Sequence, residues 1–116
     1  MIKKVMIKEA YCSDDVCKLL KEKGFKEPCT ALNKLVIKNG EKPFMKVTHQ
    51  KAMAWLREVH DIETCVEYSI PDDAYNYTII IKDVTNGFTI IHSEDTYEFY
   101  EKATDELLKY CLKNLI

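Results

Sequence analysis

The clearest periodicity in the chain lies at its centre, over residues 48–60. At about 100° per residue, apolar side chains fall on one side of a helix and polar side chains fall on the other. The members of the apolar set are Ala52, Trp55, Leu56 and Val59. Thr48 can accept a hydrogen bond from a free backbone N–H in the first turn. The pattern therefore predicts a helix after Thr48, with Trp55 anchored in the core.

Two more helices are predicted nearer the two ends of the chain. Ser13 can cap the first of them, and Gly24 can end it in the left-handed conformation. Asp95 or Thr96 starts the last helix, which runs close to the end of the chain. Asp95 and Glu98 fit a capping box loosely, with Asp in place of Ser or Thr.

Strand-like segments separate these helices. Alternation of apolar and polar residues indicates half-buried strands, and two Asn-Gly pairs are strong hairpin signals because both residues tolerate positive φ. The predicted strands cover residues 35–38, 44–45, 64–70, 75–84 and 88–92. Residues 5–7 are an apolar run that is either an edge strand or a lead-in. The expected order is α-β-β-α-β-β-β-α, in one α+β domain over residues 1–116, with an antiparallel meander packed against helices.

Size and charge limit the function classes without choosing one. The chain has 116 residues, 47% of them hydrophobic, and a net charge of −2. Residues 1–58 hold 13 Lys or Arg and 7 Asp or Glu, a balance of +6, whereas residues 59–116 hold 4 and 12, a balance of −8. Because the lysines are spread out, we favour solvated faces and attraction between halves or subunits over a basic face for a polyanion.

The cysteines and the hydropathy pattern indicate a cytoplasmic setting. The five cysteines are an odd number and include no Cys-x-x-Cys pair. Residues 1–10 lack the long apolar run of a signal peptide, and no stretch is long and apolar enough to span a bilayer. We therefore expect no membrane association, and free thiols that are mostly buried.

No pattern in the sequence indicates a metal, cofactor or catalytic site. Cys12 and Cys17 are five residues apart, which would point them to different sides of a helix. His49 and His60 would lie roughly 16 Å apart along one helix, too far to share an ion. No phosphate-binding glycine loop is present. We therefore expect no metal, no cofactor and no catalytic residue.

A cysteine-dependent enzyme is one alternative function. Cys29 follows a proline in a predicted loop, and His49, His60 and His92 could in principle serve as its base. No nucleophile motif surrounds Cys29, so a small apolar plug in the loop is the favoured interpretation of this residue.

Nucleic-acid binding is the other alternative. From Thr48 onward, the α-β-β-β-α order resembles a double-stranded-RNA-binding domain. That family needs a basic start to its last helix to reach phosphates. Here residues 93–98 read Ser-Glu-Asp-Thr-Tyr-Glu, which is acidic. Element order alone is a fold analogy, so RNA or DNA binding through the lysine-rich first half stays the less favoured hypothesis.

Three blocks of sequence together resemble a known group of proteins. They are residues 17–25, the Ala-Trp-Leu-Arg-Glu-Val-His block at 54–60, and Thr96-Tyr97-Glu98 leading to a Leu-rich end at Leu115-Ile116. The chain is similar to small proteins of unknown function encoded by phages and prophages of gut bacteria. The resemblance spans most of the chain, and its middle segments differ more. It implies a mobile-element origin and a cytoplasmic host setting, and it offers no catalytic residues.

The function that we expect is a non-enzymatic protein-interaction module of phage origin, which could form a homodimer. Its partner would be a phage or host protein. Seven tyrosines could supply the contact surface, since tyrosine is enriched at protein interfaces. Tyr75, Tyr77 and Tyr110 are the ones predicted to lie outside or at an interface.

Overall fold

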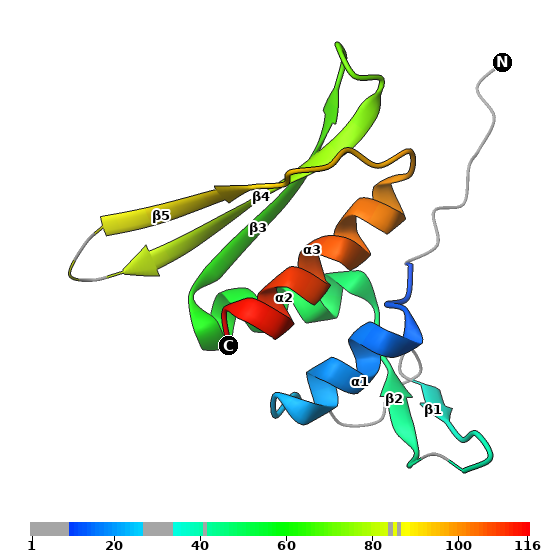
Figure 1. Cartoon of the computed structure of the whole chain (residues 1–116). Helices are drawn as coiled ribbons and strands as arrows, with labels where there is room; N and C mark the ends of the chain where they lie inside the picture. The colour runs from blue at the N-terminus through cyan, green and yellow to red at the C-terminus, as the bar shows by residue number, and fades with distance from the viewer. Residues whose placement is uncertain (1–9, 27–33, 41, 84, 86) are drawn as a thin grey trace, which may run out of the picture.

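The computed structural model describes residues 10–26, 34–40, 42–83, 85 and 87–116 (Figure 1). The predicted segment 5–7 lies outside these residues. The elements in chain order are α1 (Asp14–Glu22), β1 (Lys34–Val36), β2 (Phe44–Lys46), α2 (His49–His60), β3 (Ile62–Ser69), β4 (Ala74–Asp83), β5 (Gly87–His92) and α3 (Tyr100–Asn114). The order α-β-β-α-β-β-β-α and the α+β class are as predicted.

Helix α1 begins and ends as its sequence signals indicate. The Ser13 hydroxyl accepts from the backbone N–H of Val16 at 3.3 Å. Gly24 has a φ of +92°, which favours glycine, and the N–H of Phe25 then donates to the carbonyl of Leu20 at 2.9 Å. This turn directs Phe25 back into the core.

The hairpin of β1 and β2 differs from the prediction in its turn. The strands pair antiparallel, with Leu35 opposite Met45. Gly40 has a φ of +79°, but Asn39 does not have the positive φ that a two-residue Asn-Gly turn requires. The predicted hairpin is therefore present, but Asn39 and Gly40 do not by themselves form its connection. Pro43 has no N–H to extend the ladder, so the strands close at Phe44 and the connection is longer.

Helix α2 is capped by Thr48, whose hydroxyl accepts from the N–H of Lys51 at 3.3 Å. Ala52 and Leu56 are fully buried. Trp55 is partly buried against the core, as predicted for an anchor. Val59, expected on the same apolar side, is 60% exposed. The helical period gives the direction of a side chain but not the extent of the surface that covers it.

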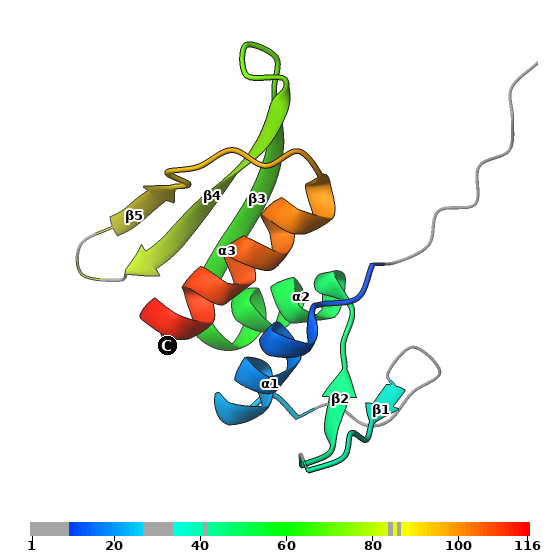
Figure 2. The same cartoon turned by 45° about the vertical axis from the view of Figure 1, so that its right-hand side comes forward.

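Strands β3, β4 and β5 form the predicted antiparallel meander, in the order β3-β4-β5. Ile79 of β4 lies opposite Thr64 of β3 and Ile91 of β5. Figures 1 and 2 show α2 and α3 on one face of this sheet, with the β1–β2 hairpin at the far end of the molecule. The buried residues Tyr77 and Ile79 point to the helices, so we call this side the inner face and the opposite side the outer face.

Helix α3 starts at Tyr100, so the predicted start at Asp95 or Thr96 is wrong. The backbone of Tyr97 instead exchanges two hydrogen bonds with that of Tyr75, at 2.7 and 2.8 Å. These bonds hold the segment extended along β4, and Phe99, the residue before the helix, gives no side-chain cap. Farther along, α3 buries Leu107, Leu108, Cys111 and Leu112 in the core.

Candidate functional site

The histidines proposed as catalytic bases lie apart from one another. Cys29 lies outside the described residues. His49 and His60 stand at opposite ends of α2, and His92 ends β5. The Nδ1 atom of His92 lies 3.2 Å from the Thr78 hydroxyl, on the sheet. The His60 ring packs edge-on against Trp55 at 4.6 Å between centroids, and its buried Nε2 has no hydrogen-bond partner among the residues that the structure describes.

His49 belongs to a buried polar contact that joins all three helices. The Oδ1 atom of Asp105 in α3 accepts from the backbone N–H of Ser13 at 2.9 Å and lies 3.4 Å from His49 Nε2. Burial would raise the pKa of Asp105, but the hydrogen bonds from His49 and Ser13 outweigh it and lower that pKa to about 2. The arrangement holds the helix ends together around one carboxylate.

Cys12 and Cys17 lie in contact beside this carboxylate, contrary to the expectation that they would point apart. Cys12 precedes the capping residue and Cys17 is in the first turn, the two positions that form a hydrophobic staple. The Cys17 Sγ donates to the Cys12 carbonyl at 3.7 Å. Contact with the Cys17 thiol and burial raise the pKa of Cys12, and the same contact lowers the pKa of Cys17.

Both thiols are buried in the core, and Cys17 also lines the hollow between α1 and β2. Cys12 is 0% exposed and Cys17 is 2% exposed. Among the described residues, no hydrogen bond joins either thiol to His49. Cys111 is also buried, which raises the pKa of its thiol to about 12. The described residues contain no group of three His, Cys, Asp or Glu side chains that could hold a metal ion.

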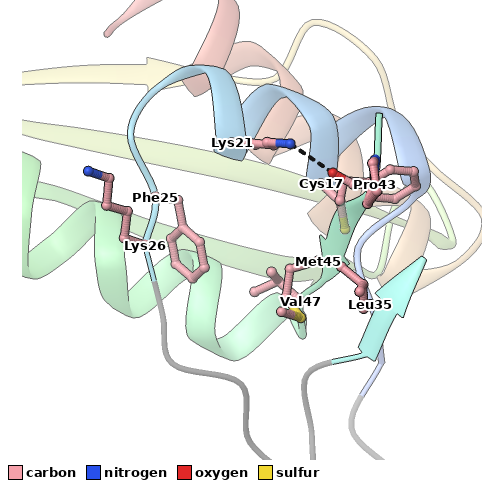
Figure 3. Close-up of a pocket in the computed structure, with 9 residues that line it drawn as sticks. Cys17, Lys21, Phe25, Lys26, Leu35, Pro43, Met45 and Val47 are labelled. Atoms are coloured by element: carbon pink, nitrogen blue, oxygen red, sulfur yellow. Dashed lines mark hydrogen bonds between the residues drawn. The ribbon is translucent and has the colours of Figure 1, made fainter. Parts of the chain in front are cut away.

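A hollow of about 310 Å³ lies between α1 and β2 (Figure 3). Its floor is apolar and includes Phe25 and Val47, and Lys21 and Lys26 lie on its rim. The Lys21 amine donates to the Pro43 carbonyl at 2.7 Å, across one side of the hollow. We assign this hollow no ligand, because residues 27–33, which follow Lys26 in the sequence, lie outside the described part of the chain.

Several lysines of the basic half are engaged within the α1 and hairpin region. Lys38 and Lys46 both form ion pairs with Asp14, the latter at 2.9 Å. Their hydrogen bonds lower the pKa of Asp14 to about 2. Lys18 lies over the Phe44 ring, 5.4 Å from its centroid. These three lysines of the basic half therefore lie against local acidic and aromatic groups.

Five tyrosines gather between the inner face of the sheet and the start of α3, and we call them the tyrosine cluster. They are Tyr68, Tyr75, Tyr77, Tyr97 and Tyr100. The Tyr75 ring meets the edges of Tyr68 and Tyr100 at 5.3 and 5.8 Å, and Tyr77 stacks on Tyr97 at 6.3 Å. Helix α3 starts at Tyr100, later than the sequence signals predicted. Tyr97 therefore lies in the extended segment before the helix, where its backbone bonds to β4.

The exposed members of this cluster are not the predicted ones. Tyr77 is only 7% exposed, and its burial raises its pKa to about 12. Tyr75 and Tyr110 are half-buried. Tyr68 and Tyr100 are instead 49% and 43% exposed. Alternation along β3 places Tyr68 on the same face as Tyr75, so the sequence alone could have indicated that these two rings meet. The exposure of Tyr100 could not be predicted in this way, because it depends on where α3 begins.

The comparisons with known proteins identify no family. No protein-family model, no curated protein sequence and no solved structure gives a significant match to this chain. Among the described helices, none combines the length and apolar character needed to cross a membrane. The candidate site therefore rests on the geometry of the chain itself.

Proposed function

We propose that this chain is a non-enzymatic protein-interaction module of phage origin that acts in the host cytoplasm. The observation that carries the proposal is the tyrosine cluster, whose exposed rings Tyr68 and Tyr100 both pack against the half-buried ring of Tyr75. Rings held in this way offer a large contact area at a small entropic cost. The resemblance of three sequence blocks to small phage proteins is the reason for proposing this origin and setting.

The buried chemistry of the chain also favours this function over an enzyme. Asp105 and its partners join helix ends, and Cys12 and Cys17 fill the core beneath them. An enzyme needs its reacting groups to meet a substrate, and these side chains meet one another. The exposed ring surface is on the sheet side of α3, away from the hairpin.

Affinity capture tests the proposal. The tagged full chain would be incubated with lysate from phage-infected host cells, next to a variant that combines Tyr68→Ala with Tyr100→Ala. We expect a specific partner whose capture falls at least about tenfold in the variant, since exposed tyrosines are frequent hot spots. Ile37→Ala is the matched control, because Ile37 is 73% exposed on the distant hairpin.

Two outcomes would contradict the proposal. One is equal capture by the tyrosine variant and by the parent chain, with circular dichroism showing both folded. The other is the loss of capture in Ile37→Ala alone, which would move the contact surface to the hairpin.

A further inference from the structure

Strand β5 is an edge of the sheet, and its sequence lacks the residues that usually prevent an edge strand from pairing with another chain. In the described residues it pairs only with β4. Its sequence, Gly-Phe-Thr-Ile-Ile-His, contains no Lys, Arg, Asp, Glu or Pro. Exposed edges usually carry such residues because unpaired backbone groups otherwise recruit another strand. The opposite edge, β3, does carry Glu63 and Glu67. The contrast marks β5 as the edge that is open to pairing.

The hydrogen-bond alternation shows which backbone groups of β5 face away from the sheet. The N–H of Ser93 donates to the carbonyl of Tyr77 at 2.9 Å, which makes this a hydrogen-bonded pair. Hydrogen-bonded pairs alternate along an antiparallel ladder, so Ile91 and Thr89 also bond to β4. The residues between them, Phe88, Ile90 and His92, therefore direct their N–H and C=O groups outward.

The side chains of these same three residues lie on the outer face, which no described helix covers. Phe88 stands opposite Lys82, and Ile90 stands opposite Ile80. Phe88 is 69% exposed and Ile90 is 57% exposed. Outward backbone groups and apolar outer-face side chains thus coincide at one short strand. A strand that bonds to this edge therefore places its own side chains next to Phe88 and Ile90.

We propose that β5 pairs with β5 of a second copy of this chain, antiparallel, with Ile90 on the two-fold axis. In this register Ile90 faces Ile90 of the second copy, and Phe88 faces His92. The three outward residues are symmetric about Ile90, so the edge is complementary to itself and about six backbone hydrogen bonds form. Ile80 and Ile90 of both copies then line up in one apolar row across the outer face.

Charge favours a second copy at β5 and disfavours one at β3. Two β5 strands bring no charged side chains of their own together. Two β3 strands would bring Glu63 and Glu67 of one copy toward the same residues of the other, and like charges across strands repel. One short strand buries less than the roughly 800 Å² per partner of a standard interface. The dimer is therefore reversible and depends on concentration.

This inference deepens the proposed function, because self-association is one of the contacts of the interaction module. It uses the outer face and edge of the sheet, whereas the tyrosine cluster lies on the inner face. Partner capture and dimerisation can therefore fail separately. Loss of the dimer with capture intact would remove only this inference, and the reverse result would remove only the proposed function.

Sedimentation of the full chain from micromolar to millimolar concentration tests the dimer. We expect a monomer–dimer equilibrium with no larger species, because a two-fold pairing closes. Ile90→Lys should weaken dimerisation at least about tenfold, since two cations would meet on the axis. Ile37→Lys is the matched control, with the same substitution at an exposed hairpin position, and should dimerise like the parent chain.

Ile90→Pro provides a second variant that acts through the backbone alone. The N–H of Ile90 faces away from β4, so a proline at this position should leave the hydrogen bonds between β4 and β5 and the circular dichroism unchanged. It should abolish the dimer, because proline has no N–H to donate to the second copy. Amide exchange should show Phe88, Ile90 and His92 becoming protected as concentration rises. A monomer at all concentrations, a dimer that survives both substitutions, or protection of β3 instead would overturn the proposal.

Discussion

At the scale of single residues, the decisive contacts join side chains that are far apart in the sequence. Asp105 accepts from the N–H of Ser13, 92 residues earlier, and pairs with His49, 56 residues earlier. Both groups lie at helix N-termini, where free N–H groups and the helix dipole favour a carboxylate. One buried side chain thereby fixes the relative positions of α1, α2 and α3.

Replacing Asp105 by Asn should destabilise the fold in a way that depends on pH. The folded pKa of about 2 is below the reference value of 3.8. The carboxylate therefore contributes stability, about 2 kcal/mol, that is complete above about pH 5 and is lost as pH falls toward 2. Urea unfolding of Asp105→Asn and the parent chain should show a gap near pH 7 that closes in acid.

The control for this pH series is Asp95→Asn, because Asp95 is exposed and lies outside the helices. It should unfold like the parent chain at each pH. A gap between Asp105→Asn and the parent that stays constant from pH 7 to pH 2 would contradict the role given to this carboxylate.

The thiols provide a second prediction at the residue scale. In a Cys29→Ser background, an aromatic disulfide reagent should label the exposed Cys65 rapidly in the native protein. Cys12, Cys17 and Cys111 should react only as fast as the protein opens, because they are buried. Adding Cys65→Ser should remove the fast phase. A remaining fast phase would show that the thiol pair at α1 is accessible and would reopen the enzyme alternative.

At the scale of elements, the sequence predicts the helix ends that depend on local contacts. It does not predict those that depend on contacts with distant segments of the chain. Ser13, Thr48 and Gly24 act at the helix ends where their side chains or backbone freedom predict. Asp95 and Thr96 carry a comparable signal and cap nothing. The backbone bonds between Tyr75 and Tyr97 hold that segment extended, so tertiary pairing overrides the local preference.

The same limit applies to the candidate site. Alternation along β3 and β4 predicts which side chains share a face, and so Tyr68 and Tyr75 could be placed together from the sequence. The exposure of these two tyrosines could not be predicted from the sequence, because it depends on where α3 starts and on how much of the sheet α3 covers. The sequence also does not show how much surface covers each side chain. It places Val59 on the apolar side of its helix and Tyr77 outside or at an interface, whereas Val59 is 60% exposed and Tyr77 is buried.

Substitution of the two candidate caps distinguishes a cap that functions from one that does not. Thr48→Ala should lower the free energy of unfolding by about 1 kcal/mol, since it leaves the N–H of Lys51 without its acceptor. Thr96→Ala should change it by less than about 0.5 kcal/mol, as expected for an exposed residue outside a helix. Equal losses in the two variants would contradict the observed start of α3.

At the scale of the whole molecule, part of the charge asymmetry between the two halves of the chain is compensated locally. The balance of +6 in the first half is partly compensated by the ion pairs of Lys38 and Lys46 with Asp14. The two contact surfaces that we propose, the tyrosine cluster and β5, lie instead on the sheet. They occupy its inner and outer faces, which allows a dimer to present two tyrosine clusters at once.

A gel-shift titration checks the charge argument. The full chain should show no salt-dependent shift of double-stranded RNA or DNA, because specific binding would require an open array of cations over the phosphates. A basic double-stranded-RNA-binding domain serves as the positive control. Lys18 and Lys42 lie around one surface hollow beside Phe44. A shift at low salt that disappears as salt is raised, and that is reduced by Lys18→Ala with Lys42→Ala, would instead support the polyanion alternative.

The most direct measurement of the central claim is hydrogen exchange of the chain alone and in complex with its captured partner. We expect the complex to protect peptides that cover residues 66–77 and 97–103, where the tyrosine cluster lies, and to leave the hairpin of β1 and β2 unchanged. Protection confined to the hairpin and α1, with the tyrosine peptides exchanging as in the unbound chain, would contradict the account.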